Sequence, residues 1–151
     1  MKTKIVRGIQ LFWAYFIAIG AVVGFGMMVY DPSGVTFQMD PLLPQLREAF
    51  PFLSFMFGNF ICSAFALMAV NGIPNMISIY LIHKHNEYDA LSSLVCGGIL
   101  AVWILAEFYI WGFSGLSVAY GIFAAGQIIN AVIFLKLKRN SHVIPRREAD
   151  L

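Results

Sequence analysis

Apolar residues along this chain gather in four long runs that polar segments separate. The runs cover residues 9–30, 51–82, 91–112 and 116–137. An α-helix advances about 1.5 Å per residue, so about 20 residues cross the roughly 30 Å hydrocarbon core of a bilayer. The first, third and fourth runs have about this length. The pattern therefore predicts an all-α integral membrane protein in which four helices form a bundle.

The second apolar run is longer than one crossing and is interrupted near its middle. Its sequence from 71 to 75 is NGIPN. Pro74 removes an intrahelical hydrogen bond, and Gly72 weakens the turn before it. We therefore predict a transmembrane helix over 51–70, a proline kink, and an extension to residue 82 that lies along or beyond the membrane surface.

The polar connection after the first run contains a turn and a short helix. Residues 31–34 (DPSG) have the composition of a turn, because proline presets φ and glycine accepts positive φ. Residues 40–41 (DP) are typical of a helix cap followed by a first-turn proline. The next residues place four apolar side chains on one side of a helix that is too short to span: Leu42, Leu43, Leu46 and Phe50. We expect this helix to lie at the outer membrane surface.

Composition supports the membrane assignment. The chain has 151 residues, of which 60% are hydrophobic and 12% are charged. Soluble domains usually carry about twice that share of charge. So short a chain could not bury this much apolar surface in water, and we predict one membrane domain over residues 1–151. The net charge of +2 and the lack of interleaved basic and aromatic residues argue against nucleic-acid binding.

The basic residues predict the orientation. With four spans, the first residues, the second connection and the tail share one side, and this side holds Lys2, Lys4, Arg7, Lys84, Lys136, Lys138, Arg139, Arg146 and Arg147. The opposite side holds only Arg47. Basic loops stay in the cytoplasm, so we expect both termini there. Glu87 and Asp89 are interpreted as ordinary loop charges, and residues 138–151 as a flexible tail.

One carboxylate interrupts the third run. Trp103, Glu107 and Trp111 are spaced at i, i+4 and i+8 and therefore share one helical face. A carboxylate within a span is expensive and is a functional candidate by default. Glu107 could bind a ligand or handle protons. Alternatively, it could tie the outer segment to the helices by pairing with Arg47 or by accepting a hydrogen bond from Tyr120.

Other residues within the spans have two interpretations each. The amides of Asn59 and Gln127 must find partners in hydrocarbon, either across helices or in a polar ligand site. Gly20 and Gly24 form a G-x-x-x-G pair, and Gly121 belongs to a small-residue face in the fourth span. Such faces allow close helix approach, either within the chain or in a homo-oligomer.

The chain carries no recognised catalytic or metal-binding motif. Cys62 and Cys96 form no C-x-x-C pair and are interpreted as packing residues. His83 and His85 are two residues apart in a polar loop, whereas metal-binding helices favour a spacing of four. No histidine lies where it could bind haem within a span. We therefore expect no metal, no cofactor and no catalytic residue.

The layout resembles that of a known class. Four spans, the sequence D-P-x-G at 31–34, and Trp103-x-x-x-Glu107 before Gly112 are similar to uncharacterised small four-transmembrane-helix bacterial inner-membrane proteins. This resemblance implies a bacterial inner-membrane location and a four-helix bundle, and it brings no catalytic residues with it. Small multidrug transporters also have four helices and one membrane glutamate. Theirs lies in the first span, which here has no carboxylate, so their mechanism is not carried over.

Three functional hypotheses follow. The first is a non-enzymatic membrane protein, surrounded by lipid, that binds a lipophilic molecule or a partner membrane protein between the third span and residues 40–50. The second is a proton-coupled small-molecule carrier that uses Glu107 and dimerises through Gly20 and Gly24. The third is a lipid-modifying enzyme, for which no acid–base pair is visible at one depth.

Overall fold

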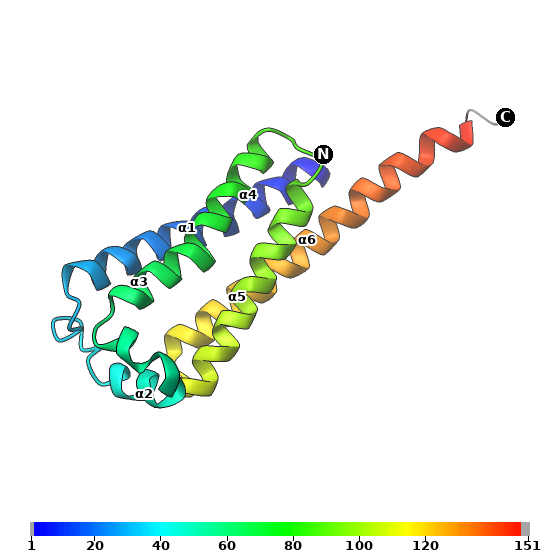
Figure 1. Ribbon diagram of the computed structural model, residues 1–151. Helices are drawn as coiled ribbons and strands as arrows, with labels where there is room; N and C mark the ends of the chain where they lie inside the picture. The colour runs from blue at the N-terminus through cyan, green and yellow to red at the C-terminus, as the bar shows by residue number, and fades with distance from the viewer. Residues whose placement is uncertain (1, 149–151) are drawn as a thin grey trace.

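The computed structural model describes residues 2–148, and within them the side chains of 3–115 and 117–139. Over these residues the chain is helical and has no strand (Figure 1). Its α-helices are α1 (Lys2–Tyr30), α2 (Leu42–Ala49), α3 (Ile61–Leu67), α4 (Ile73–His83), α5 (Asp89–Trp111) and α6 (Gly115–Glu148). A 3₁₀-helix (Pro51–Phe57) follows α2, and a π-helical turn (Met68–Gly72) joins α3 to α4.

The prediction of four apolar helices of transmembrane length is confirmed. Helical segments long and apolar enough to cross a membrane cover Thr3–Tyr30, Ile61–His83, Asp89–Trp111 and Ser117–Arg139. The first, third and fourth overlap the predicted runs closely, because their apolar residues continue without a polar break.

The second apolar helix differs from the prediction. It begins at Ile61 rather than at residue 51 and continues to His83 through α3, the π-helical turn and α4. The predicted bounds of this helix, 51–70, were therefore wrong, because residues 51–57 form a 3₁₀-helix and the apolar helix runs on past residue 70. The side chain of Asn59 explains the start, because its Oδ1 accepts a hydrogen bond from the Ile61 N–H at 3.0 Å. This bond satisfies a donor that has no partner in the first helical turn.

The helix continues past Pro74 because the turn before it is widened. The π-helical turn Met68–Gly72 directly precedes α4, and Pro74 lies in the first turn of α4. Proline is tolerated in a first turn, where its missing N–H would have no intrahelical acceptor. The Asn75 side chain adds a hydrogen bond across this region, from Nδ2 to the Asn71 carbonyl at 2.8 Å.

The four apolar helices are neighbours in space. Helix α1 packs against α3 and α4 and also against α6, and α5 packs against α4 and α6 (Figure 1). At the end where α1 finishes, α2 and the 3₁₀-helix pack against each other, and α2 also contacts α5. The Trp111 indole N–H fastens this contact by donating to the Leu42 carbonyl at 3.3 Å.

The connection between α1 and α2 is an ordered turn. The Asp31 carboxylate accepts hydrogen bonds from the Ser33 hydroxyl and from the Thr36 N–H, the latter at 2.6 Å. The Ser33 hydroxyl is the main reason that the pKa of the exposed Asp31 lies below its ordinary value, and the Thr36 N–H lowers it further. The Phe60 N–H donates to the Pro32 carbonyl at 2.9 Å, which fastens the turn to the start of the second apolar helix.

The glycines of the first span pack inside the chain. A Cβ at Gly20 would stand 2.5 Å from the Tyr120 hydroxyl, and one at Gly24 would stand 2.8 Å from a Leu67 methyl. The G-x-x-x-G face therefore packs against α6 and α3 within the chain, and dimerisation through it stays a prediction. Gly121 makes only ordinary contacts, with 3.6 Å between its Cβ position and Ile104.

Buried amides link the helices in the core. Gln127 Nε2 donates to Asn75 Oδ1 at 2.9 Å, which joins α6 to α4. Asn130 Nδ2 donates to the Val6 carbonyl at 3.1 Å, which joins α6 to α1. Gln127 and Asn75 are 1% and 0% exposed, so water cannot replace their bond. These contacts support the interpretation that the Gln127 amide binds across helices, rather than the interpretation as a polar ligand site.

A double-mutant cycle tests the link between Gln127 and Asn75. Replacing each with alanine, singly and together, should reveal a coupling of about 0.6–1.7 kcal/mol in the free energy of unfolding, the range of hydrogen bonds between membrane helices. The measurement is reversible unfolding in bicelles or mixed micelles. Asn75 and Asn59, which share no partner, form the control pair and should be additive. Additivity of Asn75 and Gln127 would show that their bond adds no stability.

A buried ion cluster joins α1, α5 and α6 at the end of the molecule that lies away from α2. The Asp89 carboxylate is 0% exposed. It receives Arg7 Nη2 at 3.2 Å on one oxygen and the Lys138 ammonium on the other. Both cations lie over the Phe134 ring, each 5.4 Å from its centroid. The interpretation of Asp89 as an ordinary loop charge was wrong, because its two partners come from helices distant in sequence.

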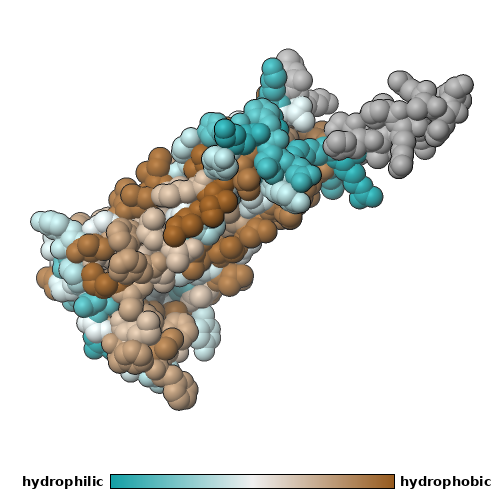
Figure 2. Space-filling view, turned by 45° about the horizontal axis from the view of Figure 1, so that its top comes forward, coloured by the Kyte–Doolittle hydropathy of each residue, from teal (hydrophilic) through white to brown (hydrophobic). Residues whose placement is uncertain are grey.

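The polar end of α6 also differs from the prediction. Residues 138–148 continue the helix, where a flexible tail had been predicted from 138, and 149–151 lie outside the described residues. Lys138 is held by Asp89, so it belongs to the packed part of the chain. Figure 2 shows hydrophilic residues gathered at the end of the molecule that holds the N-terminus, and mainly hydrophobic residues over the helices.

Candidate functional site

A cavity of about 520 Å³ lies between the apolar helices and the segment that follows the first turn. Its walls come from α1, α3, the π-helical turn, α5 and α6, and α2 with the 3₁₀-helix closes one end. The lining is mainly apolar and includes Met27, Leu46, Phe57, Phe60, Leu100 and Ile104. This size and lining are typical of small-molecule sites in proteins.

Glu107 lies on the α5 wall of the cavity and is held by two donors. The Trp103 indole N–H donates to Oε1 at 2.6 Å, and the Ser117 hydroxyl donates to Oε2 at 2.9 Å. Ser114 fixes Ser117 in turn, with 2.9 Å between their hydroxyl oxygens. Each carboxylate oxygen can accept two hydrogen bonds, so acceptor capacity remains on both oxygens.

The structure brings together some of the predicted site residues. Trp103, Glu107, Trp111 and Tyr120 all line the cavity. Trp111 also donates to α2, as described above. Among the described hydrogen bonds, none joins Tyr120 to Glu107, because the Tyr120 hydroxyl packs against Gly20 instead.

Three predicted site residues lie elsewhere. Arg47 donates through Nε to the Phe57 carbonyl at 2.7 Å and through Nη2 to the Gly58 carbonyl at 3.2 Å. The predicted pair of Arg47 with Glu107 is therefore not formed, because the guanidinium instead donates to two carbonyls at the end of the 3₁₀-helix. Asn59 starts the second apolar helix, and Gln127 belongs to the core between α4 and α6. Neither contributes to the cavity lining.

Sequence reasoning missed four polar residues of the cavity, which are Ser63, Asn71, Ser114 and Ser117. Ser117 holds Glu107, and the Ser63 hydroxyl and the Asn71 Oδ1 atom are buried in the lining without a hydrogen-bond partner. Ser117 belongs to the same small-residue face of the fourth span as Gly121, and Asn71 was considered only as part of a helix break. The available signal was that Ser63, Asn71 and Ser117 are polar side chains within apolar runs.

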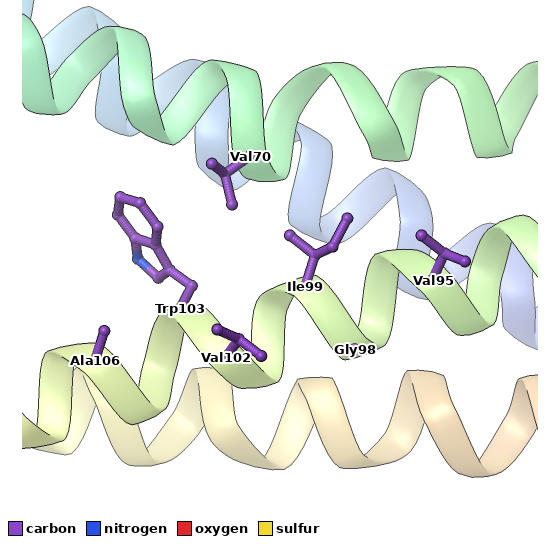
Figure 3. A pocket seen from close by; sticks show the side chains of 7 residues that line it. All are labelled: Val70, Val95, Gly98, Ile99, Val102, Trp103 and Ala106. Carbon is purple, nitrogen blue, oxygen red and sulfur yellow. The ribbon is translucent and has the colours of Figure 1, made fainter.

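A groove on the outside of α5 is lined in part by Trp103, which also lines the cavity. It has a volume of about 630 Å³ and is lined by Val70, Val95, Gly98, Ile99, Val102, Trp103 and Ala106. Figure 3 shows the Trp103 ring rising from α5 toward the helix that carries Val70. Trp103 and Ala106 line both the groove and the cavity. The Trp103 side chain therefore stands between the outer surface of α5 and Glu107.

Comparison with known proteins assigns no function to this site. The chain matches no protein-family description, no curated protein and no solved structure. The functional argument therefore depends on the cavity itself and on the helices around it.

Proposed function

We propose that the chain is a multi-pass protein of the bacterial inner membrane, in which the four apolar helices form a transmembrane bundle. The basic residues at the end that holds the N-terminus face the cytoplasm, in keeping with the bias of basic loops. Both termini are then cytoplasmic, and α2 lies along the outer surface. Four helices of transmembrane length and the hydrophilic end in Figure 2 support this arrangement.

We further propose that the protein binds a lipophilic small molecule in the cavity beside Glu107. The observation that carries this proposal is one carboxylate, held by Trp103 and Ser117, on the wall of an otherwise mainly apolar cavity. Two fixed donors orient the carboxylate before a ligand arrives, which reduces the entropy lost on binding. The apolar walls bind the body of the ligand, and Glu107 binds its polar group.

The route to the cavity passes from the lipid through the groove on α5. The groove lies on a segment of transmembrane length and is lined almost wholly by aliphatic residues. Since Trp103 and Ala106 line both spaces, movement of the Trp103 ring would connect them. A molecule dissolved in the bilayer then reaches Glu107 without crossing water.

Filling the cavity tests whether it binds a ligand. Ala66 lines the cavity, and Ala69 is exposed one turn further along the same apolar helix. In lipid nanodiscs, Ala66→Trp should abolish saturable binding of a hydroxyl-bearing solvatochromic dye, whereas Ala69→Trp should leave it unchanged. Equal loss or equal retention in both variants would overturn the proposed site.

Removing the charge of Glu107 tests its role in the same assay. Glu107→Gln should weaken binding of the dye by about 10–100-fold, the range of one hydrogen bond to a charged group. Glu48→Gln is the matched control, because Glu48 is exposed on α2 and does not line the cavity. Unchanged affinity in Glu107→Gln would leave Glu107 a structural role only.

A further inference from the structure

The polar atoms of the cavity stand on two walls. Glu107 and Ser117 belong to α5 and α6, whereas Ser63 and Asn71 belong to α3 and the π-helical turn. The first pair is already hydrogen-bonded, as described above. On the other wall, Ser63 Oγ and Asn71 Oδ1 are buried and have no hydrogen-bond partner. Asn71 is only 2% exposed, so solvent outside the protein does not satisfy it.

Buried polar atoms without partners are rare in proteins, because leaving them unpaired destabilises the fold. Two of them belong to residues that line this cavity, where a bound molecule would supply the missing hydrogen bonds, whereas the other described examples, on Arg7, Gln10 and Gln127, lie outside its lining. Asn71 Oδ1 can only accept, and the Glu107 carboxylate can only accept when ionised. The Ser63 hydroxyl can accept or donate. Beside the donors of Asn71 Nδ2 and the Tyr120 hydroxyl, the cavity therefore offers acceptors on both walls, which a ligand with donors satisfies.

The charge of the lining limits the ligand further. Glu107 is the only acidic residue among those that line the cavity, and no lysine, arginine or histidine is among them. A phosphate or carboxylate head group would meet a carboxylate with no cation to compensate it, in surroundings that strengthen charge repulsion. An ammonium group has the opposite charge and up to three donors.

We infer that the cavity selects a lipophilic amine that carries N–H donors, with its ammonium on Glu107 and a second donor toward Asn71 and Ser63. This inference rests on the proposed function and names the class of its ligand. It distinguishes N–H amines from quaternary ammonium ions, which have the positive charge but no donor, and from anionic lipids, whose net charge is negative. The hydrocarbon part of the amine packs against the apolar lining.

A matched series of ligands tests the inference. Dodecylamine, dodecyltrimethylammonium, dodecanol and dodecanoate share one hydrocarbon chain and differ in charge and donors. Each is titrated at neutral pH against the full chain in nanodiscs of uncharged lipid, and affinity is measured by displacement of the solvatochromic dye. We expect dodecylamine to bind at least 10-fold more tightly than the other three, with dodecanoate the weakest.

Variants of the second wall complete the test. Asn71→Leu and the milder Ser63→Ala should each weaken the binding of dodecylamine by about 5–20-fold. The affinity for dodecyltrimethylammonium, which cannot donate a hydrogen bond, should change by less than about 2-fold. Asn59→Leu is the control, because Asn59 lies outside the cavity. Equal affinities across the series, tightest binding of dodecanoate, or unchanged dodecylamine affinity in both variants would overturn the inference and leave the proposed function standing. If the wild-type chain binds neither the dye nor any amphiphile, the proposed function itself fails.

Discussion

Replacing Asp89 with asparagine should destabilise the protein more than any change in the cavity. The substitution leaves the Arg7 and Lys138 cations facing a neutral amide. Breaking a buried ion pair in this way usually costs about 3–5 kcal/mol. The two cations are 21% and 26% exposed and can reach some water, so we expect about 2–4 kcal/mol here. Equilibrium unfolding in mixed micelles, followed by circular dichroism, measures the loss.

Two further variants show whether unpaired charge is the cause. Glu87→Gln removes an exposed carboxylate two residues away and should change the free energy of unfolding by less than about 0.5 kcal/mol. The triple variant Arg7→Met, Asp89→Leu, Lys138→Met removes the whole cluster and should recover most of the loss, because no buried charge is left without a partner. An Asp89→Asn chain as stable as the wild type would show that the cluster contributes nothing to the fold.

The second large effect is expected at Gly34, in the turn after α1. Its φ is +77°, and a Cβ there would stand 2.5 Å from the Phe60 ring and 3.0 Å from the Asp40 nitrogen. Gly34→Ala should therefore combine backbone strain of about 1–2 kcal/mol with overpacking of about 1–3 kcal/mol. The expected sum is about 2–5 kcal/mol in the free energy of unfolding.

Gly112 separates the two contributions. Its φ is +73°, but a Cβ there would have nothing within 4 Å. Its ψ is −168°, in a region that almost only glycine adopts, so Gly112→Ala should cost backbone strain alone, about 1–3 kcal/mol. A larger loss in Gly34→Ala than in Gly112→Ala would show that the contact of the turn with Phe60 adds to the strain. Equal losses in both would show that this contact does not constrain residue 34.

The cavity was predictable in part. Its position between the third span and residues 40–50 followed from one carboxylate on the helical face of Trp103 and Trp111. The pairing of Arg47 with Glu107 did not follow, because the choice between two acceptors depends on the path of the chain after α2. The 3₁₀-helix Pro51–Phe57 turns its last carbonyls toward the guanidinium, and a sequence pattern contains no such distance.

The bounds of the second apolar helix show a related limit. Residues 51–57 are as apolar as a transmembrane segment, so hydropathy placed the crossing there. At the observed start, the Ile61 N–H donates to the side-chain oxygen of Asn59. A polar residue in an apolar run can therefore start a helix as well as bind a partner, and its neighbours decide between the two roles.

The sequence by itself determined that this protein is helical, that four of its helices can cross a membrane, and that one carboxylate lies within the third. These properties depend on the length and apolarity of local runs, which neighbouring residues set. Only the tertiary structure decided that Asp89 is buried between Arg7 and Lys138, and that Ser63, Asn71 and Glu107 line one cavity. These contacts join residues far apart in the chain, and the packing of whole helices, rather than any local pattern, brings them together.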